Sequence, residues 1–375
     1  MGLEQLRAQL DELDEKIVAL YEERMAISEL VAEDKIQTGK KVFDPAREQE
    51  KIRTLRALAH NEFNRQGIGE LYGQIMSISR KLQYQKLSEA GALGKLPFYP
   101  IDAIDKEHVR VCYQGAEGAY SQEATNSFFG EGVKSFAVDT FRDAMIAIEE
   151  GSADFAVLPI ENSTAGVVTE IYDLLSEYEN YIIAEQIIPI RHCLIGLPDA
   201  REEEIRTVFA HPQALMQSAQ FLAAHPKWQQ ISLKNNAFAV KRVKSDGDPT
   251  QAAIAGELAA GIYGMKILRR GIQSARSNST RFIIVTNQKV FLKDAKRVSI
   301  CFEIRHEAGS LYHLMSHIIY NNLNMTKIES RPMEERDWEY RFFIDFEGNL
   351  LDSAVKNALR GLREEALNLR ILGNY

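Results

Sequence analysis

The first chemically informative feature of this 375-residue sequence is a charge on an apolar helix face. Leu13, Ile17 and Leu20 lie three and four residues apart, a spacing that places side chains on one face of an α-helix. Arg24 follows Leu20 by four residues and so takes the next position on that face. A buried arginine without a counter-charge costs several kcal/mol, so Arg24 requires either an ion pair, with Glu48 as the candidate, or an anionic ligand.

Other hydrogen-bonding groups accompany Arg24 on the packing faces of this region. They are Arg7 and Lys35 beside the same line, Glu48 on a second apolar line, and Ser79 and Gln83 on a third. A cluster of this size is better explained by a polar pocket inside a helical bundle than by one ion pair that fixes register. Cations and neutral donors in such a pocket suit a small polycarboxylate ligand.

A second group of polar residues lies at predicted strand ends in the middle of the chain. The run 161–164 follows a strand at 155–158, the run 211–213 follows a strand at 208–210, and the run 278–281 precedes a strand at 282–286. Because α/β sheets bind ligands at strand ends, these runs predict a second site.

Three helices position the first group. The first ends at Gly39, the second runs from the Asp44-Pro45 cap to about Asn64, and the third spans roughly Gly69 to Ser88. One very long and two shorter helices cannot bury their apolar stripes alone. We therefore expect a homodimer or a higher homo-oligomer.

The whole sequence predicts a multidomain fold that combines three classes. Residues 1–90 form an all-α helical domain, residues 91–107 a linker, and residues 108–288 an α/β domain. Residues 296–375 read as strand, helix, strand, strand, helix, strand, the order of an α+β ferredoxin-like module.

Composition excludes several classes of protein. A net charge of −8 argues against a nucleic-acid partner, no apolar run is long enough to span a membrane, and three cysteines favour the reducing cytoplasm. His313 and His317 lie one helical turn apart but lack a third ligand, so we interpret them as an exposed helix face. No dinucleotide fingerprint occurs. We expect no metal and no cofactor.

The helical region resembles the all-helical chorismate mutases over its whole length. The resemblance rests on Leu6-Arg7, Leu13–Ile17, Glu23-Arg24, Lys35, Asp44–Glu48 and Ser79–Gln83. It implies an intertwined dimer with two active sites, in each of which Arg7 comes from the partner chain.

The same resemblance implies residue roles. Arg24 and the borrowed Arg7 would bind the two carboxylates of chorismate, while Lys35 and Gln83 would donate to the ether oxygen that gains negative charge. The residues that would hold the ring hydroxyl and orient the substrate are Asp44, Arg47, Glu48 and Ser79. The rearrangement to prephenate is unimolecular, so it needs conformational restraint and charge stabilisation rather than a nucleophile.

The middle region resembles prephenate dehydratase over its full length. The matching runs are Gly115–Ser121, Pro159–Ser163, His192–Leu194, His211–Gln213 and Thr280–Phe282. The resemblance implies two α/β lobes like those of a periplasmic binding protein, with the active site in the cleft between them.

In this family pattern Thr280 is catalytic. A threonine hydroxyl is too weak an acid to lose its proton outright, so we expect it to hydrogen-bond the departing hydroxyl, with Arg281 nearby for a carboxylate. Helix N-termini near Ser121 and Ser163 are candidates for the other carboxylate. Ser121 can equally be a plain helix cap, and Asn162 either a substrate ligand or a turn residue.

The sequence departs from the dehydratase pattern in two places. Asn235-Asn236-Ala237 stands where relatives have a Ser-Thr-Ala-type stretch, and Ala210 replaces the usual serine before His211. Asparagine still donates and accepts hydrogen bonds, so we expect activity to persist.

The C-terminal module resembles the ACT domain, a small amino-acid-sensing unit. Its ligand motifs correspond to Gly309-Ser310-Leu311 and Glu329–Pro332. The implied allosteric residues are Gly309, Leu311, Glu329, Ser330 and Arg331. The resemblance implies feedback inhibition by phenylalanine.

These features together predict a bifunctional enzyme of phenylalanine biosynthesis that converts chorismate to prephenate and prephenate to phenylpyruvate. One alternative is a non-catalytic amino-acid sensor, which would not need the polar cluster around Arg24. A second is a dehydratase that acts on arogenate, which the motifs do not distinguish from prephenate.

Overall fold

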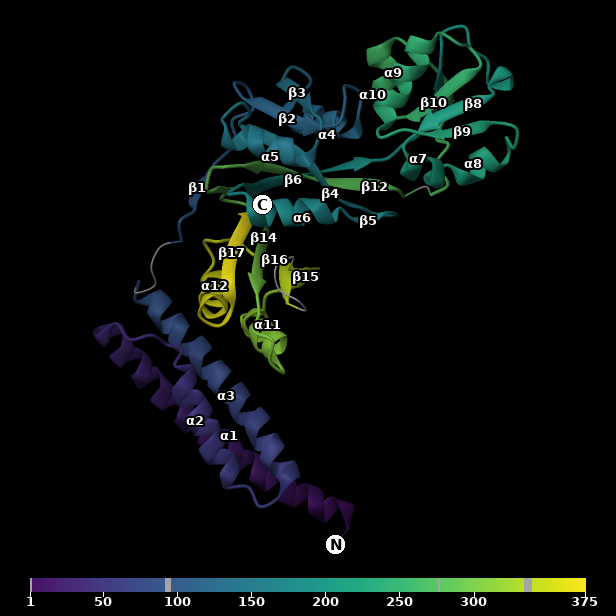
Figure 1. Cartoon of the computed structure of the whole chain (residues 1–375). Coiled ribbons are helices and arrows are strands. Elements are labelled where there is room, and N and C mark those ends of the chain that lie inside the picture. The colour runs from purple at the N-terminus through teal and green to yellow at the C-terminus, as the bar shows by residue number, and fades with distance from the viewer. Residues whose placement is uncertain (1, 92–95, 276, 334–338) are drawn as a thin grey trace. The chain divides into compact units, whose positions relative to one another are not determined.

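The computed structural model describes residues 2–91, 96–275, 277–333 and 339–375. The chain forms two compact units (Figure 1). One contains the helical region to Pro97 together with Lys296–Ile371, and the other contains Phe98–Ala295 with Leu372–Tyr375. Residues 92–95 of the expected linker lie outside the described residues.

Three helices open the first unit. They are α1 (Leu3–Thr38), α2 (Pro45–Ala57) and α3 (Glu62–Glu89). Gly39 ends α1 with a left-handed φ of 67°, as predicted. The Asp44 carboxylate accepts a hydrogen bond from the Arg47 amide at 3.0 Å and so caps α2, also as predicted.

The predicted boundary between the second and third helices is wrong. The second helix ends at Ala57 rather than near Asn64, and the third begins at Glu62 rather than near Gly69. The physical reason is a cap that the sequence analysis missed, because Asn61 accepts a hydrogen bond from the Asn64 amide at 2.7 Å.

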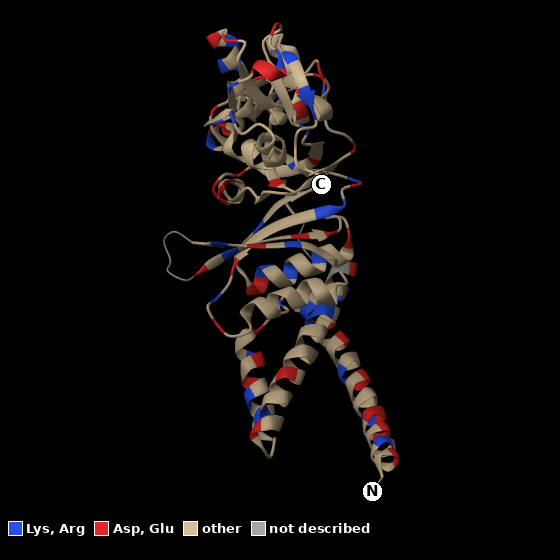
Figure 2. Ribbon diagram, turned by 90° about the vertical axis from the view of Figure 1, so that its right-hand side faces the viewer, with Lys and Arg blue, Asp and Glu red and all other residues tan. Residues whose placement is uncertain are grey.

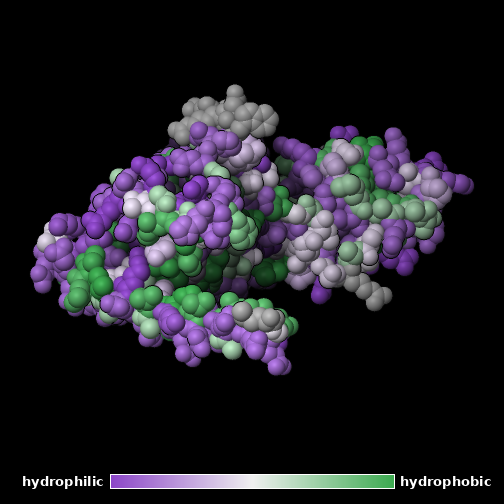
Figure 3. All heavy atoms as spheres, turned by 90° about the horizontal axis from the view of Figure 1, so that it is seen from below, coloured by the Kyte–Doolittle hydropathy of each residue, from purple (hydrophilic) through white to green (hydrophobic). Residues whose placement is uncertain are grey.

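The apolar stripe of α1 is largely uncovered within the described chain. Leu10, Ile17 and Ile27 are 58%, 59% and 56% exposed, whereas Ala32 near the helix end is buried against α3 and Val42. Figure 2 shows the N-terminal part of α1 diverging from the α2–α3 pair, and Figure 3 shows hydrophobic side chains on the surface of the helical region. An exposed stripe of this length is typical of an oligomer interface.

The C-terminal module has the predicted order of strands and helices. Its elements are β14 (Arg297–Glu303), α11 (Ser310–Tyr320), β15 (Met325–Pro332), β16 (Tyr340–Glu347), α12 (Ser353–Glu365) and β17 (Leu367–Asn374). The strands are arranged in the order β15-β16-β14-β17. Helices α11 and α12 pack on α3, so the helical region and this module share one compact unit.

The interpretation of His313 and His317 as an exposed helix face is wrong for the second residue. His317 is only 6% exposed, because α11 turns that face towards α12 and α3.

The second unit has two lobes, and each is built around five neighbouring strands of a sheet. The first lobe contains β2 (Arg110–Gln114), α4 (Tyr120–Phe129), β3 (Lys134–Val138), α5 (Phe141–Glu149), β4 (Phe155–Asn162), β5 (Gly166–Val167), α6 (Thr169–Glu177), β6 (Tyr181–Pro189) and β12 (Ser279–Thr286). Its main strands lie in the order β6-β12-β4-β2-β3. Two further short strands, β1 (Tyr99–Ile101) and β13 (Val290–Leu292), pair in parallel.

The second lobe is inserted between β6 and β12 of the first. It contains β7 (Cys193–Gly196), a 3₁₀ turn (Glu202–Glu204), β8 (Thr207–Ala210), α7 (Pro212–Gln217), α8 (Ala219–Ala223), β9 (Gln229–Ser232), α9 (Asn236–Asp246), β10 (Gln251–Ala255), α10 (Glu257–Tyr263) and β11 (Lys266–Arg270). The strand order is β11-β7-β10-β8-β9. The two-lobed arrangement agrees with the expectation from the sequence.

Two glycines let the lobes touch at the start of α4. Gly115 and Gly118 have φ values of +123° and +86°. A Cβ atom at Gly115 would lie 2.8 Å from the Asn235 amide nitrogen, and one at Gly118 would lie 2.7 Å from Cα of Ala259. Only glycine satisfies both the backbone conformation and this close approach.

None of the helices in the described ranges is both long and apolar enough to cross a membrane.

Candidate active sites

The first candidate site is a chain of polar side chains between α1 and α3. The Lys35 ammonium donates to Gln83 Oε1 at 2.9 Å and to the Val42 carbonyl at 2.8 Å. Gln83 Nε2 donates to Ser79 Oγ at 3.3 Å, and Ser79 Oγ donates to Ser28 Oγ at 2.8 Å. The helices thus bring Lys35, Ser79 and Gln83 together, as the sequence analysis expected.

Burial affects the charge on Lys35. Loss of hydration lowers the pKa of its ammonium, although the carboxylates of Glu48 and Glu364 oppose that shift. The same half-buried surroundings strengthen any hydrogen bond that this ammonium donates.

Arg24 lies one turn before Ser28 on α1. Its Nη1 atom is buried and has no hydrogen-bond partner among the described residues. Glu48 is ion-paired with Arg80 instead, so the alternative of an Arg24–Glu48 ion pair, which the sequence analysis ranked below a ligand pocket, does not hold. A buried guanidinium nitrogen without a partner is the feature expected of a site that awaits an anion.

Three other predicted residues are distributed along the helices. Arg7 is exposed on α1, about 25 Å from Arg24 at a rise of about 1.5 Å per residue, so one chain does not bring the two together. Asp44 caps α2, and Arg47 is exposed in the first turn of that helix.

Arg80 is a central residue that the sequence analysis quoted in a motif but left without a role. Its side chain is 7% exposed, lies 4.7 Å from the centre of the Phe43 ring and pairs with Glu48 and with Glu365 at 2.8 Å. Burial opposes the charge, but the two carboxylates outweigh it and raise the pKa of Arg80. A basic residue next to Ser79 on a predicted packing face was the available signal.

A cavity of about 240 Å³ adjoins this ion pair. It lies among α2, α3, α11 and α12 and is lined by Phe43, Pro45, Glu48, Gln49, Ile52, Gly73, Arg80, Arg305, Glu307, Ser310, His313, Leu314, Glu364 and Glu365.

The second candidate site is centred on Thr280. The sequence analysis placed Thr280 and Asn162 in turns, but both lie within strands, directly opposite each other in the β4–β12 ladder. Backbone pairing continues past the apolar residues that were used to set the strand ends. Asn162 Nδ2 donates to Thr280 Oγ1 at 2.9 Å and to Asn278 Oδ1 at 2.9 Å.

Asn162 is held in one orientation by its other atom. Its Oδ1 accepts hydrogen bonds from the amides of Thr164 and Ala165 at 3.0 and 2.9 Å and from the Thr164 hydroxyl at 2.8 Å. Because the oxygen is occupied by donors, the Nδ2 group must face Thr280.

A hydrogen-bonded chain joins this pair to the second lobe. Gln217 on α7 donates through Nε2 to Thr164 Oγ1 at 2.8 Å, and its Oε1 lies 2.9 Å from His192 Nε2. His192 Nδ1 lies 3.1 Å from the Tyr120 hydroxyl. The Gln217 orientation makes Nε2 of His192 the donor, so Nδ1 accepts from Tyr120. Gln217 and Tyr120 were not identified from sequence.

An open cavity of about 280 Å³ lies beside this series of hydrogen-bonded side chains, in the cleft between the lobes. Its lining residues come from both lobes and are Thr164, Gln213, Met216, Gln217, Gln273, Ser274, Ala275 and Asn278.

Arg281 is not brought to this cleft. Successive strand residues point to opposite faces, and its guanidinium pairs with Glu161 at 3.2 Å and Glu185 at 3.5 Å. The expectation that Arg281 lies beside Thr280 is therefore wrong.

Ser121 lies at the expected helix N-terminus, whereas Ser163 does not. Ser121 lies in the first turn of α4, but its hydroxyl donates to the Gln114 carbonyl at 2.6 Å, so it is not a cap. Ser163 is not at a helix N-terminus, because Asn162 turns the chain into β5 and α6 begins only at Thr169.

The departures from the dehydratase pattern have clear structural roles. The Asn235 side chain caps α9 by accepting from the Ala237 amide at 2.7 Å. Asn236 Oδ1 accepts from the His211 amide at 2.8 Å, directly after Ala210. The asparagines thus supply the acceptors that this wall of the second lobe uses.

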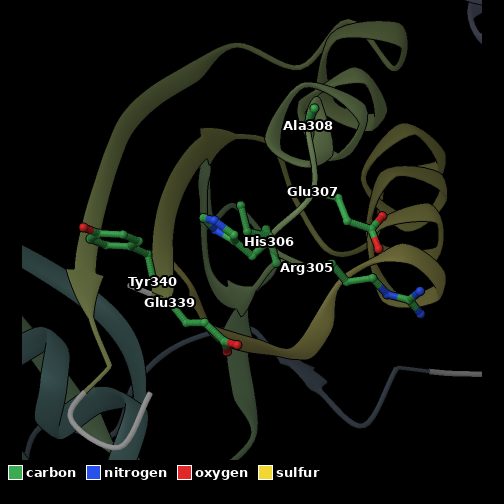
Figure 4. Close-up of a pocket in the computed structure, with 7 residues that line it drawn as sticks. Arg305, His306, Glu307, Ala308, Glu339 and Tyr340 are labelled. Atoms are coloured by element: carbon green, nitrogen blue, oxygen red, sulfur yellow. The ribbon is translucent and has the colours of Figure 1, made fainter. Parts of the chain in front are cut away.

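The C-terminal module contains a third cavity, of about 320 Å³. It is lined by Ile304–Ala308, Glu339 and Tyr340, and Figure 4 shows Tyr340 across from Arg305 and Glu307. Gly309 follows this lining directly and is the N-cap of α11 with φ of 84°, and Leu311 lies in the first turn. Glu329, Ser330 and Arg331 lie on β15, whose Pro332 is opposite Tyr340.

Known proteins match both halves of the chain. The chorismate mutase type II family matches residues 6–84, and the prephenate dehydratase family matches residues 111–290. The bifunctional chorismate mutase/prephenate dehydratase of Pseudomonas aeruginosa is 31% identical over 379 residues, which cover 100% of this chain and 97% of that relative.

Two further relatives match about three quarters of the chain. The chloroplastic arogenate dehydratase/prephenate dehydratase 1 of Arabidopsis thaliana is 36% identical over 78% of this chain and 79% of its own. The structure of prephenate dehydratase from Arthrobacter aurescens in complex with L-Phe has a TM-score of 0.67 and 27% identity, and covers 71% of this chain and 89% of that chain.

The helical bundle and the two-lobed unit define a two-domain enzyme of aromatic amino-acid biosynthesis. The chain belongs to the bifunctional chorismate mutase/prephenate dehydratase family. It therefore carries both activities, and the alternative of a non-catalytic sensor is wrong.

His192 generates a prediction about pH. Burial lowers the pKa of this imidazole, and the hydrogen bond to Gln217 only partly offsets the effect. The unfolded chain, with an ordinary histidine pKa of about 6.5, then binds the proton more readily than the folded chain. The free energy of unfolding should fall as pH drops below about 6.5, by at most about 1.4 kcal/mol per pH unit.

The test compares urea unfolding at pH 7.5 and pH 5.5. The His192→Gln variant should lose less stability between the two pH values than wild type, because glutamine does not take up a proton. His108→Gln replaces an exposed histidine of the same unit and should behave like wild type. An equal pH dependence in all three proteins would contradict the prediction.

Proposed function

We propose that the mutase site is formed by two copies of this chain and that Arg24 is its anion-binding centre. The observation that carries the proposal is the buried Nη1 of Arg24 without a partner, next to the Lys35–Gln83–Ser79 chain. The exposed stripe of α1 supports a homodimer, in which a second copy covers that stripe and supplies Arg7. Arg7 and Arg24 would then bind the two carboxylates of chorismate.

The remaining mutase residues stabilise charge and orient the ring. An ammonium has three protons, and the described contacts of Lys35 use two, which leaves one for the ether oxygen. Gln83 would turn its amide from Ser79 to the same oxygen. Donors aimed at an atom that gains charge stabilise the transition state more than the ground state. Asp44, Arg47, Glu48 and Ser79 would bind the ring hydroxyl and orient the substrate.

For the dehydratase we propose that the Thr280 hydroxyl donates a hydrogen bond to the departing hydroxyl. Thr280 Oγ1 already accepts from Asn162, so its own hydrogen is directed elsewhere, and the adjacent cleft cavity can receive a small molecule. The bond between the ring and its carboxylate carbon breaks, and its electron pair enters the ring as carbon dioxide leaves. The hydroxyl departs as water after taking up one proton from solvent. Asn162 would hold Thr280 in place, and Ser121 and Ser163 are proposed as further substrate-binding residues.

Prephenate is the proposed dehydratase substrate, in the cytoplasm, with arogenate as the second candidate. The Arabidopsis relative carries both names, which favours testing both compounds.

The C-terminal module is proposed to be an ACT domain that binds phenylalanine and inhibits the dehydratase. Support comes from its βαββαβ order and from the L-Phe complex of the Arthrobacter enzyme.

The two reactions should be separable by single substitutions. Arg24→Ala removes the anion-binding guanidinium and should reduce chorismate rearrangement at least about a hundredfold, while supplied prephenate is still dehydrated. Thr280→Val keeps the shape but removes the donor, so it should stop phenylpyruvate formation and let prephenate accumulate. Arg53→Ala, at an exposed pair on α2, and Thr207→Val should change neither rate. Loss of both activities in either test variant would contradict separate sites.

Phenylalanine inhibition can be tested with the full chain. Calorimetry should detect phenylalanine binding to wild type and its loss in the double variant Glu329→Gln, Ser330→Ala, with relief of dehydratase inhibition. The exposed Glu347→Gln serves as the control and should bind normally. Allostery also requires that substrate weaken phenylalanine binding reciprocally. Undiminished binding to the double variant, or no binding to any of the proteins, would contradict the proposal.

A further inference from the structure

We propose that Glu365, in the C-terminal module, is a positioning residue for the mutase and acts on Glu48 through Arg80. The inference rests on the proposed place of Glu48 in the mutase site. It assigns to the C-terminal module a part in the first reaction that is separate from phenylalanine binding.

The contacts form a largely buried series in which the carboxylates of Glu48 and Glu365 alternate with the nitrogen groups of Arg80 and His317. Arg80 donates one nitrogen, Nη1, to Glu48 Oε2 and the other, Nη2, to Glu365 Oε1 at 2.8 Å. His317 Nε2 lies 2.9 Å from the same Glu365 oxygen. The side chains of Arg80, His317 and Glu365 are 7%, 7% and 12% exposed, and that of Glu48 is 23% exposed at the open end of the series.

The charge state of Glu365 is well determined by its surroundings. Burial works against ionisation, but the hydrogen bond from His317 and the charges of His317 and Arg80 outweigh it and lower the pKa of this carboxyl. Glu365 is therefore an anion at neutral pH. It holds Arg80 from the side opposite to Glu48.

Close packing makes the series rigid. Gly361, one turn before Glu365 on α12, lies so close to the His317 ring that a Cβ atom there would overlap the ring. Glycine at this position lets His317 reach Glu365, at the cost of a weaker helix. A glycine that weakens α12 but lets His317 hold Glu365 is explained if the position of the Glu365 carboxylate is important for function.

A second carboxylate of α12 fixes the same wall of the site. Glu364 accepts from the Phe43 amide at 3.1 Å and from the Tyr84 hydroxyl. Burial and the nearby Glu364 charge raise the pKa of Tyr84, so the phenol keeps its proton and remains the donor. Phe43 directly precedes the cap of α2, and Tyr84 follows Gln83 on α3. Helix α12 thus approaches the mutase residues in one defined position.

The physical effect follows from the fixed guanidinium. Arg80 engages Oε2 of Glu48, which leaves Oε1 as the oxygen for a substrate hydroxyl. Without Glu365, a buried Nη2 would lose its counter-charge, and Arg80 would move towards solvent or further onto Glu48. Either movement misplaces the Glu48 carboxylate, and an error of about 1 Å in a catalytic group is costly.

The experiment measures mutase and dehydratase kinetics in full-length variants. Glu365→Gln removes the charge with little change of shape and should lower the mutase kcat about tenfold or more, with a smaller change in KM. Dehydration of supplied prephenate should be unchanged. Glu347→Gln, an exposed glutamate of the same module, should leave both reactions unchanged. Arg80→Lys should repeat the mutase defect, because a lysine cannot bridge two carboxylates in this geometry.

A double-mutant cycle separates positioning from a general structural role. In a Glu48→Gln background the further change Glu365→Gln should have almost no effect, whereas a purely structural defect would add to the first. Equal mutase kcat in wild type and Glu365→Gln, or full additivity in the cycle, would overturn the inference. If Glu48→Gln alone left the mutase intact, the proposed site assignment would fail and the inference with it. An inactive Glu48→Gln beside an active Glu365→Gln would overturn the inference only.

Discussion

A positive charge buried in a helix bundle must find a negative partner, and the helical unit is organised around that requirement. Arg24 stands where an apolar residue would complete a helix face, and its buried nitrogen has no partner within the described chain. Glu48, the partner that the sequence analysis considered for Arg24, is ion-paired with Arg80. Arg80 is thus neutralised inside the bundle, and in the proposed mutase site Arg24 would bind the substrate anion. The apolar stripe along α1 is exposed, and in the proposed homodimer a second chain would cover it and supply Arg7.

The two-lobed unit meets a different constraint, since the proposed dehydratase site lies in the cleft between the lobes and depends on how they pack. Glycine at 115 and 118 allows the backbone of one lobe to touch the helices of the other. The chain Thr280–Asn162–Thr164–Gln217–His192 then crosses the cleft by side-chain hydrogen bonds. Each amide in it is oriented by its neighbours, so Asn162 holds Thr280 Oγ1 in place, as the proposed role of Thr280 requires. Preorganised donors of this kind favour the transition state without further ordering.

Much of this organisation could be predicted from local patterns. Gly39, Asp44-Pro45 and the βαββαβ order depend on caps and periodicities within a few residues, and the structure agrees with them. The cap at Asn61 was missed because the helix it begins contains glycines that normally indicate a break. Thr280 and Asn162 were placed in turns because the predicted strands were ended at their last apolar residues. Backbone pairing in a sheet does not require apolar residues, so the strands extend further. The Arg80–Glu365 pair joins residues 285 positions apart, and no periodicity relates them.

The central claim is that a complete mutase site needs Arg24 from one chain and Arg7 from another. The most direct measurement mixes two inactive full-length variants, Arg7→Ala and Arg24→Ala, unfolds and refolds them together, and assays chorismate loss. Half of the dimers should be mixed, and each has one site with both arginines, so about a quarter of wild-type mutase activity should return. Dehydratase activity, unaffected by either change, gives the amount of refolded protein. A mixture no more active than the separate variants would contradict the claim.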